Sequence, residues 1–423
     1  MLDLTGKSVA ILGAGRSGQA AAALASHCGA EVTIYDSRDV PGATLATPEF
    51  ALKVKSDLVV VSPGIETLGD FVQSFAKGSE ALWGEVELAW RCYSGHVIGI
   101  TGTNGKTTTT ELVRELVEVT GKSCVACGNY GVPLSEVVLY DFVPDVVALE
   151  LSSFQLETIV DFKPDAVVWL NFSPDHMDRY KAVSEYREAK LRILENISDD
   201  TLVVSRLGEN LPPKGQLVTF SSVDSADWSL SGDDILKNGE SFLKLSETKL
   251  RGLHNAENLM AACAILPQIS QDQVRSALAK YSPPEHRCES IAEKKGVEYL
   301  NDSKATNLHA LESALRSQTR PTILIAGGKE KGLDYTPILP LLKEQAKEVV
   351  TFGEIGKALS QVFSQTVPVT VVETLAEAVV AAAELSQEGD LVLLSPGTSS
   401  FDQFRGYEDR GQAFKAAVTA LPA

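Results

Sequence analysis

A glycine-rich loop with one lysine is the strongest chemical motif of the chain. It reads Gly-Thr-Asn-Gly-Lys-Thr-Thr over residues 102–108. The apolar stretch 96–100 before it predicts a strand, and the stretch 107–120 after it predicts a helix. In such a loop the glycines let backbone N–H groups point at phosphate oxygens, while Lys106 neutralises the β- and γ-phosphates. The pattern therefore predicts an ATP site at which the Thr107 hydroxyl binds Mg²⁺.

The loop departs from the common phosphate-loop pattern at its start. Ile100 stands six residues before Lys106, where that pattern has glycine, and the first glycine comes at Gly102. A glycine-rich turn with a solvated lysine is the alternative to a phosphate site. The order of strand, loop and helix favours the phosphate site.

Two further polar positions follow apolar stretches and are suited to holding a cation. Glu150 lies at the end of the predicted strand 145–151, where a carboxylate beside a phosphate loop could bind a hard cation such as Mg²⁺. His176 lies in the polar run 171–178 that follows the next predicted strand. The alternatives are a hydrogen-bonded glutamate at a strand end and a structural histidine.

A second glycine motif stands near the N-terminus. Gly-Ala-Gly-Arg-Ser-Gly at 13–18 follows a predicted strand and opens an alanine-rich helix, and Asp36 ends the next strand. Alone, this pattern predicts NAD binding and an oxidoreductase. However, the chain after Asp36 is too short for a six-stranded Rossmann domain before residue 92, and NAD would leave the 102–108 loop unexplained. Another pyrophosphate carrier fits the same glycines.

The elements that position these motifs alternate along the chain. Short stretches rich in Val and Ile alternate with longer amphipathic ones, which predicts an α/β fold with parallel, internal sheets. The predicted strands are 8–13, 31–35, 58–61, 96–100, 145–151, 166–170, 201–204, 322–326, 348–352 and 391–395. A helix is expected over 83–90.

Two breaks divide the chain. The first is the segment 91–95, and the second is the segment 281–287 with its two prolines, which end any helix. We predict three domains: a Rossmann-like domain over 1–92, a central P-loop domain over 93–284 and a Rossmann-like domain over 285–423.

Composition narrows the class of protein. With 44% hydrophobic and 22% charged residues in 423, the chain has the make-up of a globular protein. A net charge of −18 argues against nucleic-acid and anionic-membrane partners. Six cysteines are too few for a disulfide scaffold, and no signal-peptide pattern is visible, so we expect a cytoplasmic protein. The Cys124-x-x-Cys127 pair suggests either redox or zinc chemistry or two buried structural cysteines.

The phosphate loop resembles that of the Mur ligase family, whose members join amino acids to a cell-wall nucleotide precursor. Further matches follow in order through nearly the whole chain: a Y-x-x-A-K run at 186–190, an HNxxN run at 254–258, the run 301–307 and the segment 394–404. The resemblance implies a monomeric, ATP- and Mg²⁺-dependent amide ligase of peptidoglycan synthesis that works through an acyl phosphate. It also implies catalytic roles for Lys106, Glu150, His176 and Lys190.

The same resemblance assigns the ligands. It implies ATP contacts from Gly102, Thr103, Asn104, Gly105, Lys106, Thr107, Thr108, Asn258, Arg287 and Asp302. It implies metal ligation by Thr107, Glu150, His176 and a carbamoylated Lys190. Because some ATP residues belong to a separate predicted domain, domain closure before the chemistry is expected.

Within the family, the chain is most similar to members that add D-glutamate to UDP-N-acetylmuramoyl-L-alanine. The implied contacts to the UDP precursor are Gly15, Arg16, Ser17, Asp36, Ser37, Arg38, Asn129, Gly131, Ser152 and Ser153. Those to D-glutamate are Lys304, Thr306, Lys331, Ser400 and Tyr407. The family usually has Phe where Tyr407 stands, which leaves that contact open. Addition of a different amino acid, and a P-loop phosphotransferase or regulatory NTPase, stay as alternatives.

Overall fold

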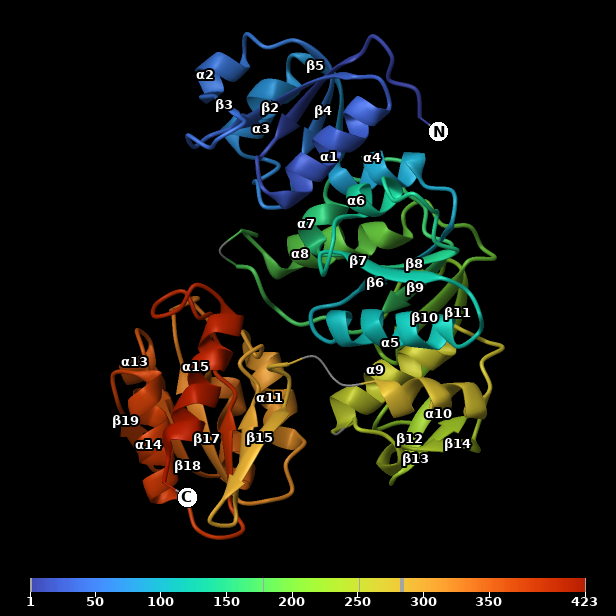
Figure 1. Ribbon diagram of the computed structural model, residues 1–423. Coiled ribbons are helices and arrows are strands. Elements are labelled where there is room, and N and C mark those ends of the chain that lie inside the picture. The colour runs from blue at the N-terminus through green and yellow to red at the C-terminus, as the bar shows by residue number, and fades with distance from the viewer. Residues whose placement is uncertain (1, 178, 251, 282–284, 423) are drawn as a thin grey trace. The chain divides into compact units, whose positions relative to one another are not determined.

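Three β-sheets follow one another along the chain, each flanked by helices (Figure 1). The computed structural model describes residues 2–177, 179–250, 252–281 and 285–422. Asp178 and residues 282–284 of the predicted proline linker lie outside the described residues. The chain forms two compact units, residues 1–247 with 257–281, and residues 248–256 with 282–423. The predicted α/β class with three sheet domains is confirmed.

The first sheet is parallel and has five strands in the order β3-β2-β1-β4-β5. Helices cover both of its faces, because alternate residues of β1 enter different cores: Val9 and Ile11 pack with α1, while Ala10 and Leu12 pack toward α2 and α3. The strands are β1 (Ser8–Leu12), β2 (Glu31–Asp36), β3 (Thr44–Leu45), β4 (Ser56–Val61) and β5 (Ser79–Gly84). The helices are α1 (Arg16–His27), α2 (Pro48–Ala51), α3 (Asp70–Ala76) and α4 (Glu85–Cys92).

The predicted helix over 83–90 is wrong at its start. Trp83 belongs to β5, where it pairs with Val60 of β4, and the helix begins only at Glu85. The parallel ladder to β4 supplies the backbone hydrogen bonds of this segment, and an aromatic side chain suits a strand. Amphipathic spacing around two tryptophans could not distinguish the strand from the helix that follows it.

The central sheet has nine strands in the order β14-β13-β12-β11-β10-β9-β6-β8-β7. Its strands are β6 (His96–Thr101), β7 (Cys124–Gly128), β8 (Val146–Glu150), β9 (Ala166–Trp169), β10 (Leu202–Arg206), β11 (Gln216–Ser221), β12 (Trp228–Ser231), β13 (Asp234–Lys237) and β14 (Glu240–Lys244). The associated helices are α5 (Lys106–Glu118), α6 (Leu134–Val138), α7 (Ser153–Leu156), α8 (Val183–Leu191), α9 (Leu253–Ala264) and α10 (Gln271–Lys280).

The expectation of parallel sheets is wrong at the far edge of this sheet. β12, β13 and β14 form an antiparallel meander, whereas β6 to β12 pair in parallel. The turn between β13 and β14 is Asn238-Gly239, and both residues have positive φ, 52° and 82°. Asn-Gly is the turn pair that suits a two-residue hairpin, so the sequence carried a local signal for this meander.

The order of the central strands determines where a ligand can bind. β6 lies between β8 and β9, so the chain leaves β6 toward one side and later returns to its other side. At such a switch point the carboxyl ends of neighbouring parallel strands open a crevice. The glycine loop after β6, Glu150 at the end of β8 and the polar run after β9 all meet there.

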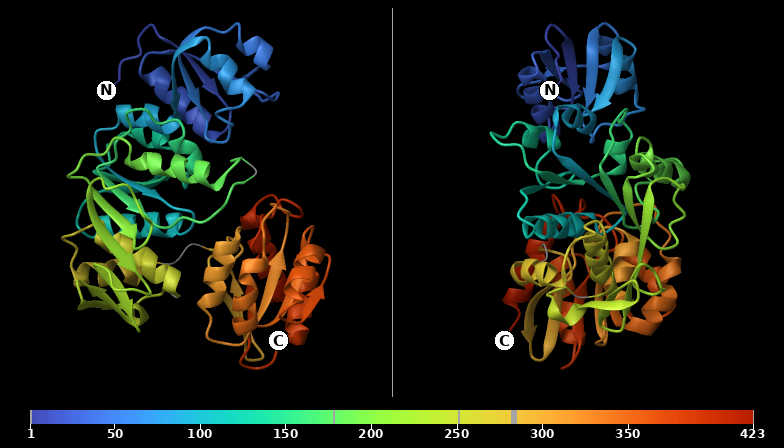
Figure 2. Two further views of the ribbon diagram at one scale, coloured as in Figure 1. Left: turned by 180° about the vertical axis from the view of Figure 1, so that it is seen from behind. Right: turned by 90° about the vertical axis from the view of Figure 1, so that its right-hand side faces the viewer.

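The C-terminal sheet has six strands in the order β15-β16-β20-β17-β18-β19, with helices on both sides (Figure 2). Among the strands that the structure describes in this sheet, β15 alone is antiparallel to its neighbour. Residues Ile323 and Ile325 of β17 face α14 and α15, while Leu324 and Ala326 face α11 to α13. The strands are β15 (Glu289–Lys294), β16 (Val297–Asn301), β17 (Thr322–Gly327), β18 (Ala346–Phe352), β19 (Val369–Val371) and β20 (Leu391–Leu394). The helices are α11 (Leu308–Arg316), α12 (Leu339–Gln345), α13 (Gly356–Phe363), α14 (Leu375–Leu385) and α15 (Tyr407–Ala420). None of the described helices is long and apolar enough to cross a bilayer.

Candidate functional site

The glycine loop connects β6 to α5, and its shape requires glycine at two positions. Gly102 has φ 153° and Gly105 has φ 84°, in the left-handed region that side chains disfavour. A Cβ at Gly105 would overlap Oδ1 of Asn258. Helix α5 then begins at Lys106, whose Nζ donates to the carbonyl oxygens of Gly102 and Thr103, both at 2.9 Å. The ammonium therefore lies over the loop, where the phosphates of a nucleotide would be bound.

Asn171, which lies just beyond the end of β9, holds the loop in this shape. The backbone N–H of Asn104 donates to Asn171 Oδ1 at 2.9 Å, and Asn171 Nδ2 donates to the Asn104 carbonyl at 3.1 Å. The N–H of Thr103 donates to the Asn171 carbonyl at 2.8 Å. The sequence motifs did not predict this role, although Asn171 opens the polar run that contains His176.

Asn258 on α9 also contacts the loop helix. Its Oδ1 accepts a hydrogen bond from the Thr109 hydroxyl at 3.3 Å, and the side chain is buried. Thr107 and Thr108 are buried in the first turn of the same helix. The structure thus places the predicted ATP residue Asn258 against the predicted phosphate loop.

The two carboxylate oxygens of Glu150 differ in their hydrogen bonds to the described residues. The residue is buried at the end of β8, and its Oε1 accepts from Asn129 Nδ2 at 2.8 Å. Its Oε2 is buried without a hydrogen-bond partner among the residues that the structure describes. A buried acceptor of this kind is normally satisfied, so the free oxygen fits a site that a cation completes. Asn129 was predicted to orient the precursor and lies directly on this carboxylate.

Lys190 on α8 reaches the same place from another helix. It is 1% exposed, and its Nζ donates to the Gly102 carbonyl oxygen at 2.8 Å. Burial, and then repulsion from Lys106, set the pKa of Lys190 well below its usual value, while Asp175 and Glu150 act in the opposite direction. Lys106, Glu150 and Lys190 therefore act on one another electrostatically.

His176 lies on the edge of this group of residues. It has φ 58°, its N–H donates to Asp175 Oδ1 at 2.8 Å, and its ring meets those of Phe154 and Tyr186 edge-on at 4.9 and 5.7 Å. Tyr186 in turn lies under the Lys190 amine, 4.9 Å from ring centroid to Nζ. The buried carboxylate of Asp175 is a further polar group of the site that was not among the predicted residues.

In the first domain, the predicted precursor residues organise one another. Asp36 is buried and accepts hydrogen bonds from the N–H groups of Ala14 and Arg38, both at 3.0 Å. Burial opposes ionisation, but these hydrogen bonds outweigh it and lower the pKa of Asp36. The carboxylate therefore holds the glycine turn before α1, where Gly15 is the N-cap and Arg16 and Ser17 begin the helix. Ser37 is the residue between Asp36 and Arg38.

Arg16 connects the first domain to the central one. Its Nη1 donates to the Gly131 carbonyl at 3.0 Å, and its Nε and Nη2 donate to the carboxylate of Glu136. Two residues predicted to bind the precursor, Arg16 and Gly131, are thus in contact. Ser152 caps α7 by accepting from the Gln155 N–H, and Ser153 is buried at the start of that helix.

The second compact unit carries the residues predicted to bind D-glutamate. Lys331 Nζ donates to the Thr306 carbonyl at 3.1 Å, and the Lys304 ammonium lies 3.7 Å from the centroid of the Tyr407 ring. An aromatic face stabilises a cation at this distance, and Phe would do the same, so the change to Tyr407 preserves this contact. Ser400 is buried in the loop after β20.

Asp302, predicted to bind ATP, is buried in the loop after β16. Its Oδ2 accepts from the Ser395 hydroxyl at 2.9 Å, and its Oδ1 accepts from the Cys288 N–H at 3.3 Å. Burial raises the pKa of Asp302 to about 7, although these hydrogen bonds and the charge of Arg287 act in the opposite direction. Arg287, the other predicted ATP residue of this unit, is therefore electrostatically close to Asp302.

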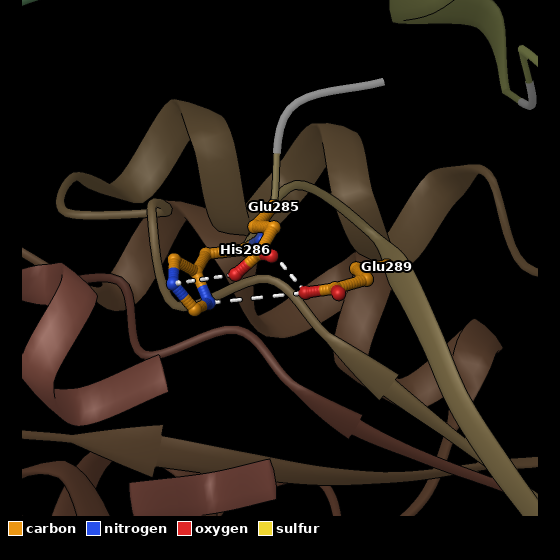
Figure 3. Close-up of side chains that lie close together, drawn as sticks. All are labelled: Glu285, His286 and Glu289. Atoms are coloured by element: carbon orange, nitrogen blue, oxygen red, sulfur yellow. Dashed lines mark hydrogen bonds and ion pairs between the residues drawn. The ribbon is translucent and has the colours of Figure 1, made fainter. Parts of the chain in front are cut away.

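One group of three described side chains has the spacing of a metal site, Glu285, His286 and Glu289 (Figure 3). The two carboxylates already form ion pairs with the ammonium of Lys415. Lys415 Nζ lies 3.0 Å from Glu285 Oε2 and 2.7 Å from Glu289 Oε1. Nδ1 of the buried His286 ring also forms a hydrogen bond with Asn301 Nδ2 at 2.9 Å. The cluster is therefore an ion-pair network that holds α15 to the start of this unit.

The C-x-x-C pair is buried in β7. Burial raises the pKa of Cys124 to about 12 and that of Cys127 well above its usual value. Thiols that stay protonated are poor nucleophiles and poor metal ligands, which favours the structural interpretation.

Comparison with known proteins extends over the whole chain. Residues 100–266 match the Mur ligase middle domain, residues 286–398 match the Mur ligase glutamate ligase domain, and residues 11–68 match an NAD(P)-binding Rossmann-like domain. The UDP-N-acetylmuramoylalanine--D-glutamate ligase of Myxococcus xanthus is 39% identical, and the match covers 99% of this chain and 100% of that protein. The enzyme of that name from Geobacter metallireducens is 36% identical, with 99% of both chains covered.

Solved structures show the same fold. The UDP-N-acetylmuramate-alanine ligase MurC of Thermotoga maritima matches with a TM-score of 0.63 and 19% identity over 98% of this chain and 99% of that one. The MurF ligase of Thermotoga maritima in complex with ADP matches with a TM-score of 0.61 and 16% identity over 99% and 96%.

The geometry of the glycine loop predicts that Gly105→Ala impairs ATP binding. A methyl group there would displace Asn258 and strain the loop, so we expect the Kd for ATP to rise about tenfold or more. Isothermal titration calorimetry would measure it. Gly121→Ala is a matched control, because Gly121 has φ 86° and no atom within 4 Å of the added Cβ. The control should lose about 1 kcal/mol of stability and no affinity. Equal Kd values for the two variants would contradict the steric role of Gly105.

The buried carboxyl of Asp302 predicts a pH-dependent stability. The folded state keeps this proton up to about pH 7, whereas the unfolded chain loses it near 3.8, so stability falls as the pH rises through this window. Asp302→Asn removes the ionisation. Relative to the native protein it should gain about 2 kcal/mol between pH 5 and pH 8, measured by urea unfolding.

Asp334→Asn in the same unit is the control for this effect. Hydrogen bonds from Thr336 lower the pKa of Asp334, so the residue is ionised in both states throughout the window from pH 5 to pH 8. Its difference from the native protein should be constant there. A constant difference for Asp302→Asn as well would show that Asp302 ionises normally.

Proposed function

The chain belongs to the Mur ligase family, and we propose that it joins D-glutamate to UDP-N-acetylmuramoyl-L-alanine in peptidoglycan synthesis, with ATP converted to ADP and phosphate. The observation that carries the proposal is a full-length similarity to ligases of that specificity. The oxidoreductase alternative has less support, because the first sheet stops at five strands and the dinucleotide-binding match is confined to residues 11–68.

The reaction has two steps. A carboxylate oxygen of the alanyl residue attacks the γ-phosphorus of ATP, so that an acyl phosphate forms and ADP leaves. The amine of D-glutamate then attacks the acyl carbon and loses a proton, and inorganic phosphate leaves. Each step brings negatively charged groups together, so the protein must supply positive charge and exclude water.

The loop between β6 and α5 would bind the phosphates of ATP. Backbone N–H groups at the start of α5 and the Lys106 ammonium, held by two loop carbonyls, would neutralise the β- and γ-phosphates. Asn171 keeps the loop in that shape before any ligand arrives. Preorganised charge of this kind stabilises the transition state more than the ground state.

The residues near the loop fit a magnesium ion. Glu150 has a buried carboxylate oxygen with no hydrogen-bond partner among the described residues, and Thr107 supplies a hydroxyl in the first turn of α5. We propose that these two oxygens and His176 would hold the ion. When bound, Mg²⁺ would neutralise phosphate charge as the γ-phosphoryl group is transferred.

Lys190 would serve this ion only after modification. An amine supplies no oxygen ligand, and its Nζ is occupied with the Gly102 carbonyl. The family resemblance implies a carbamate, formed when the neutral amine adds to carbon dioxide and releases a proton. The burial of Lys190 favours the neutral amine, which supports the proposal.

Recognition of D-glutamate would fall to the loops of the second unit. Lys331 and Lys304 bring positive charge for its carboxylates, while Thr306, Ser400 and Tyr407 border the same loops. Precursor binding would fall to the Asp36, Arg16 and Asn129 region of the first unit. A monomeric state and a cytoplasmic location are part of this proposal.

A phosphate-release assay tests the function. Purified protein with Mg²⁺, ATP and UDP-N-acetylmuramoyl-L-alanine should release phosphate at a rate that rises at least about tenfold on addition of D-glutamate. L-Glutamate is the control and should have little effect. Release that ignores every amino acid would indicate a phosphotransferase or NTPase, and a change in NADH absorbance would favour the oxidoreductase.

The lysine modification has its own test. Lys190→Ala should lower kcat about 100-fold or more, because the oxygen ligand and the packing of the loop are both lost. A small carboxylate such as acetate or formate should restore part of the activity of this variant by occupying the vacated volume. Lys181→Ala, a change at an exposed lysine near the start of the same helix, should behave as the native protein in both conditions. Failure of every small carboxylate to restore activity, combined with the absence of a carbamate signal in the ¹³C NMR spectrum of the native protein in ¹³C-labelled bicarbonate, would contradict the carbamate.

A further inference from the structure

Arg410 is a fully buried arginine that the proposed chemistry does not use. It lies in the first turn of α15, has 0% exposure, and is among the largest buried side chains of the protein. Its Nε donates to the Ser303 hydroxyl at 3.0 Å and its Nη2 to the Ser303 carbonyl at 2.8 Å. Its Nη1 donates to the carbonyls of Thr398 and Ser399 at 3.1 and 3.2 Å.

Burial of the Arg410 charge costs free energy, which simple helix packing would not require. None of the four acceptors in the described structure is a carboxylate, and the carboxyl groups of Asp402 and Asp302 act on Arg410 only through space. Burial lowers the pKa of Arg410 to about 10, which leaves it cationic at neutral pH. Phe414 lies one turn later on the same face of α15 and packs there as an apolar ring in the core. A buried charge is retained where its hydrogen bonds are needed.

The acceptors of Arg410 belong to two separate loops. Ser303 lies in the loop after β16, and Thr398 and Ser399 lie in the loop after β20, the neighbouring strand. A guanidinium has a fixed, planar set of donors, so binding both loops fixes their distance and orientation. Packed apolar side chains could not define the positions of individual carbonyl oxygens in this way.

A third loop is tied to the same arrangement. The Lys329 N–H donates to the Ser399 carbonyl at 2.9 Å, and the Thr398 hydroxyl donates to the Lys329 carbonyl. A Cβ at Gly328 would overlap the Ser399 carbonyl and lie 3.1 Å from Arg410 Nη1, so the loop after β17 packs tightly against these groups. The Ser303 hydroxyl also donates to the Tyr407 carbonyl at 2.8 Å.

These three loops and the start of α15 carry the five residues proposed to bind D-glutamate. Lys304 and Thr306 follow Ser303, Lys331 follows Lys329, Ser400 follows Ser399, and Tyr407 begins the helix of Arg410 itself. The guanidinium binds the loops after β16 and β20 directly and is linked to the loop after β17 through Thr398 and Ser399.

We propose that Arg410 is a positioning residue of the D-glutamate pocket, which acts by fixing the loops after β16 and β20 rather than by touching substrate. The proposal rests on the proposed function. Loss of the Arg410 guanidinium would let the cationic and hydroxyl groups of the D-glutamate pocket move apart by a fraction of an ångström or more. Small misplacements of this kind weaken binding and catalysis strongly. The precursor, whose proposed contacts lie in the first unit, should be unaffected.

The test compares Arg410→Met and Arg410→Lys with Arg405→Met. Arg405 is an exposed arginine just before the same helix, with Asp409 as its ion-pair partner, and serves as the matched control. We expect Arg410→Met to raise the KM for D-glutamate about tenfold or more and to leave the KM for UDP-N-acetylmuramoyl-L-alanine within about twofold. Arg410→Lys should lie between, because an ammonium cannot donate to all four oxygens at once. The control should match the native enzyme.

Two outcomes would overturn the proposal. One is an unchanged KM for D-glutamate in Arg410→Lys or Arg410→Met. The other is a parallel rise of both KM values with a lowered unfolding temperature, which would show that Arg410 only stabilises the fold. If Arg410→Met does not fold, Arg410→Lys decides. The proposed function is tested separately, by the phosphate-release assay on the native enzyme. If the native enzyme uses another amino acid, the KM values of the Arg410 variants are compared for that amino acid.

Discussion

The carbonyl oxygen of Gly102 accepts hydrogen bonds from two lysine amines, and the arrangement of the candidate phosphate site depends on it. Lys106 comes from the helix that follows the loop, and Lys190 comes from α8, much later in the chain. Two cations cannot both be buried at one oxygen without cost, so the more buried amine, Lys190, has the lowered pKa. The contact brings two lysine amines, one with a lowered pKa, to the place where Glu150 Oε2 has no hydrogen-bond partner among the described residues.

The sheet topology explains why these groups meet. β6 lies between β8 and β9, and the carboxyl ends of parallel strands share one edge of the sheet. Side chains hold the loops at that edge: Asn171 after β9 supports the loop after β6, and Asn129 after β7 supports Glu150 at the end of β8. The site is therefore preorganised by hydrogen bonds between loops rather than by the loops' own conformational preferences.

In the C-terminal unit, loops also meet at one edge of a mostly parallel sheet, but a different kind of side chain joins them. The acceptor loops of this unit follow neighbouring parallel strands, and a single buried guanidinium from α15 joins them. Asp302 shows the accompanying cost, since burial beside Ser395 raises the pKa of its carboxyl to about 7. Buried polar groups in both units thus lie beside the residues proposed to bind ligands, while the two faces of the C-terminal sheet are packed with apolar side chains.

The sequence by itself determined the α/β class, the two glycine loops and the family, because these depend on local features: hydrophobic stretches, glycines at fixed spacing and motifs in a fixed order. It also carried a hairpin signal at Asn238-Gly239, although the strand pattern alone predicted only parallel sheets. Only the tertiary structure decided that Trp83 pairs in a strand, since β5 forms by hydrogen bonding to β4. Likewise, only the fold shows that Asn171 and Arg410 hold loops in place. Asn171 bonds to Asn104, 67 residues away, and Arg410 bonds to Ser303, 107 residues away. Hydrogen bonds over such separations leave no local pattern in a single sequence.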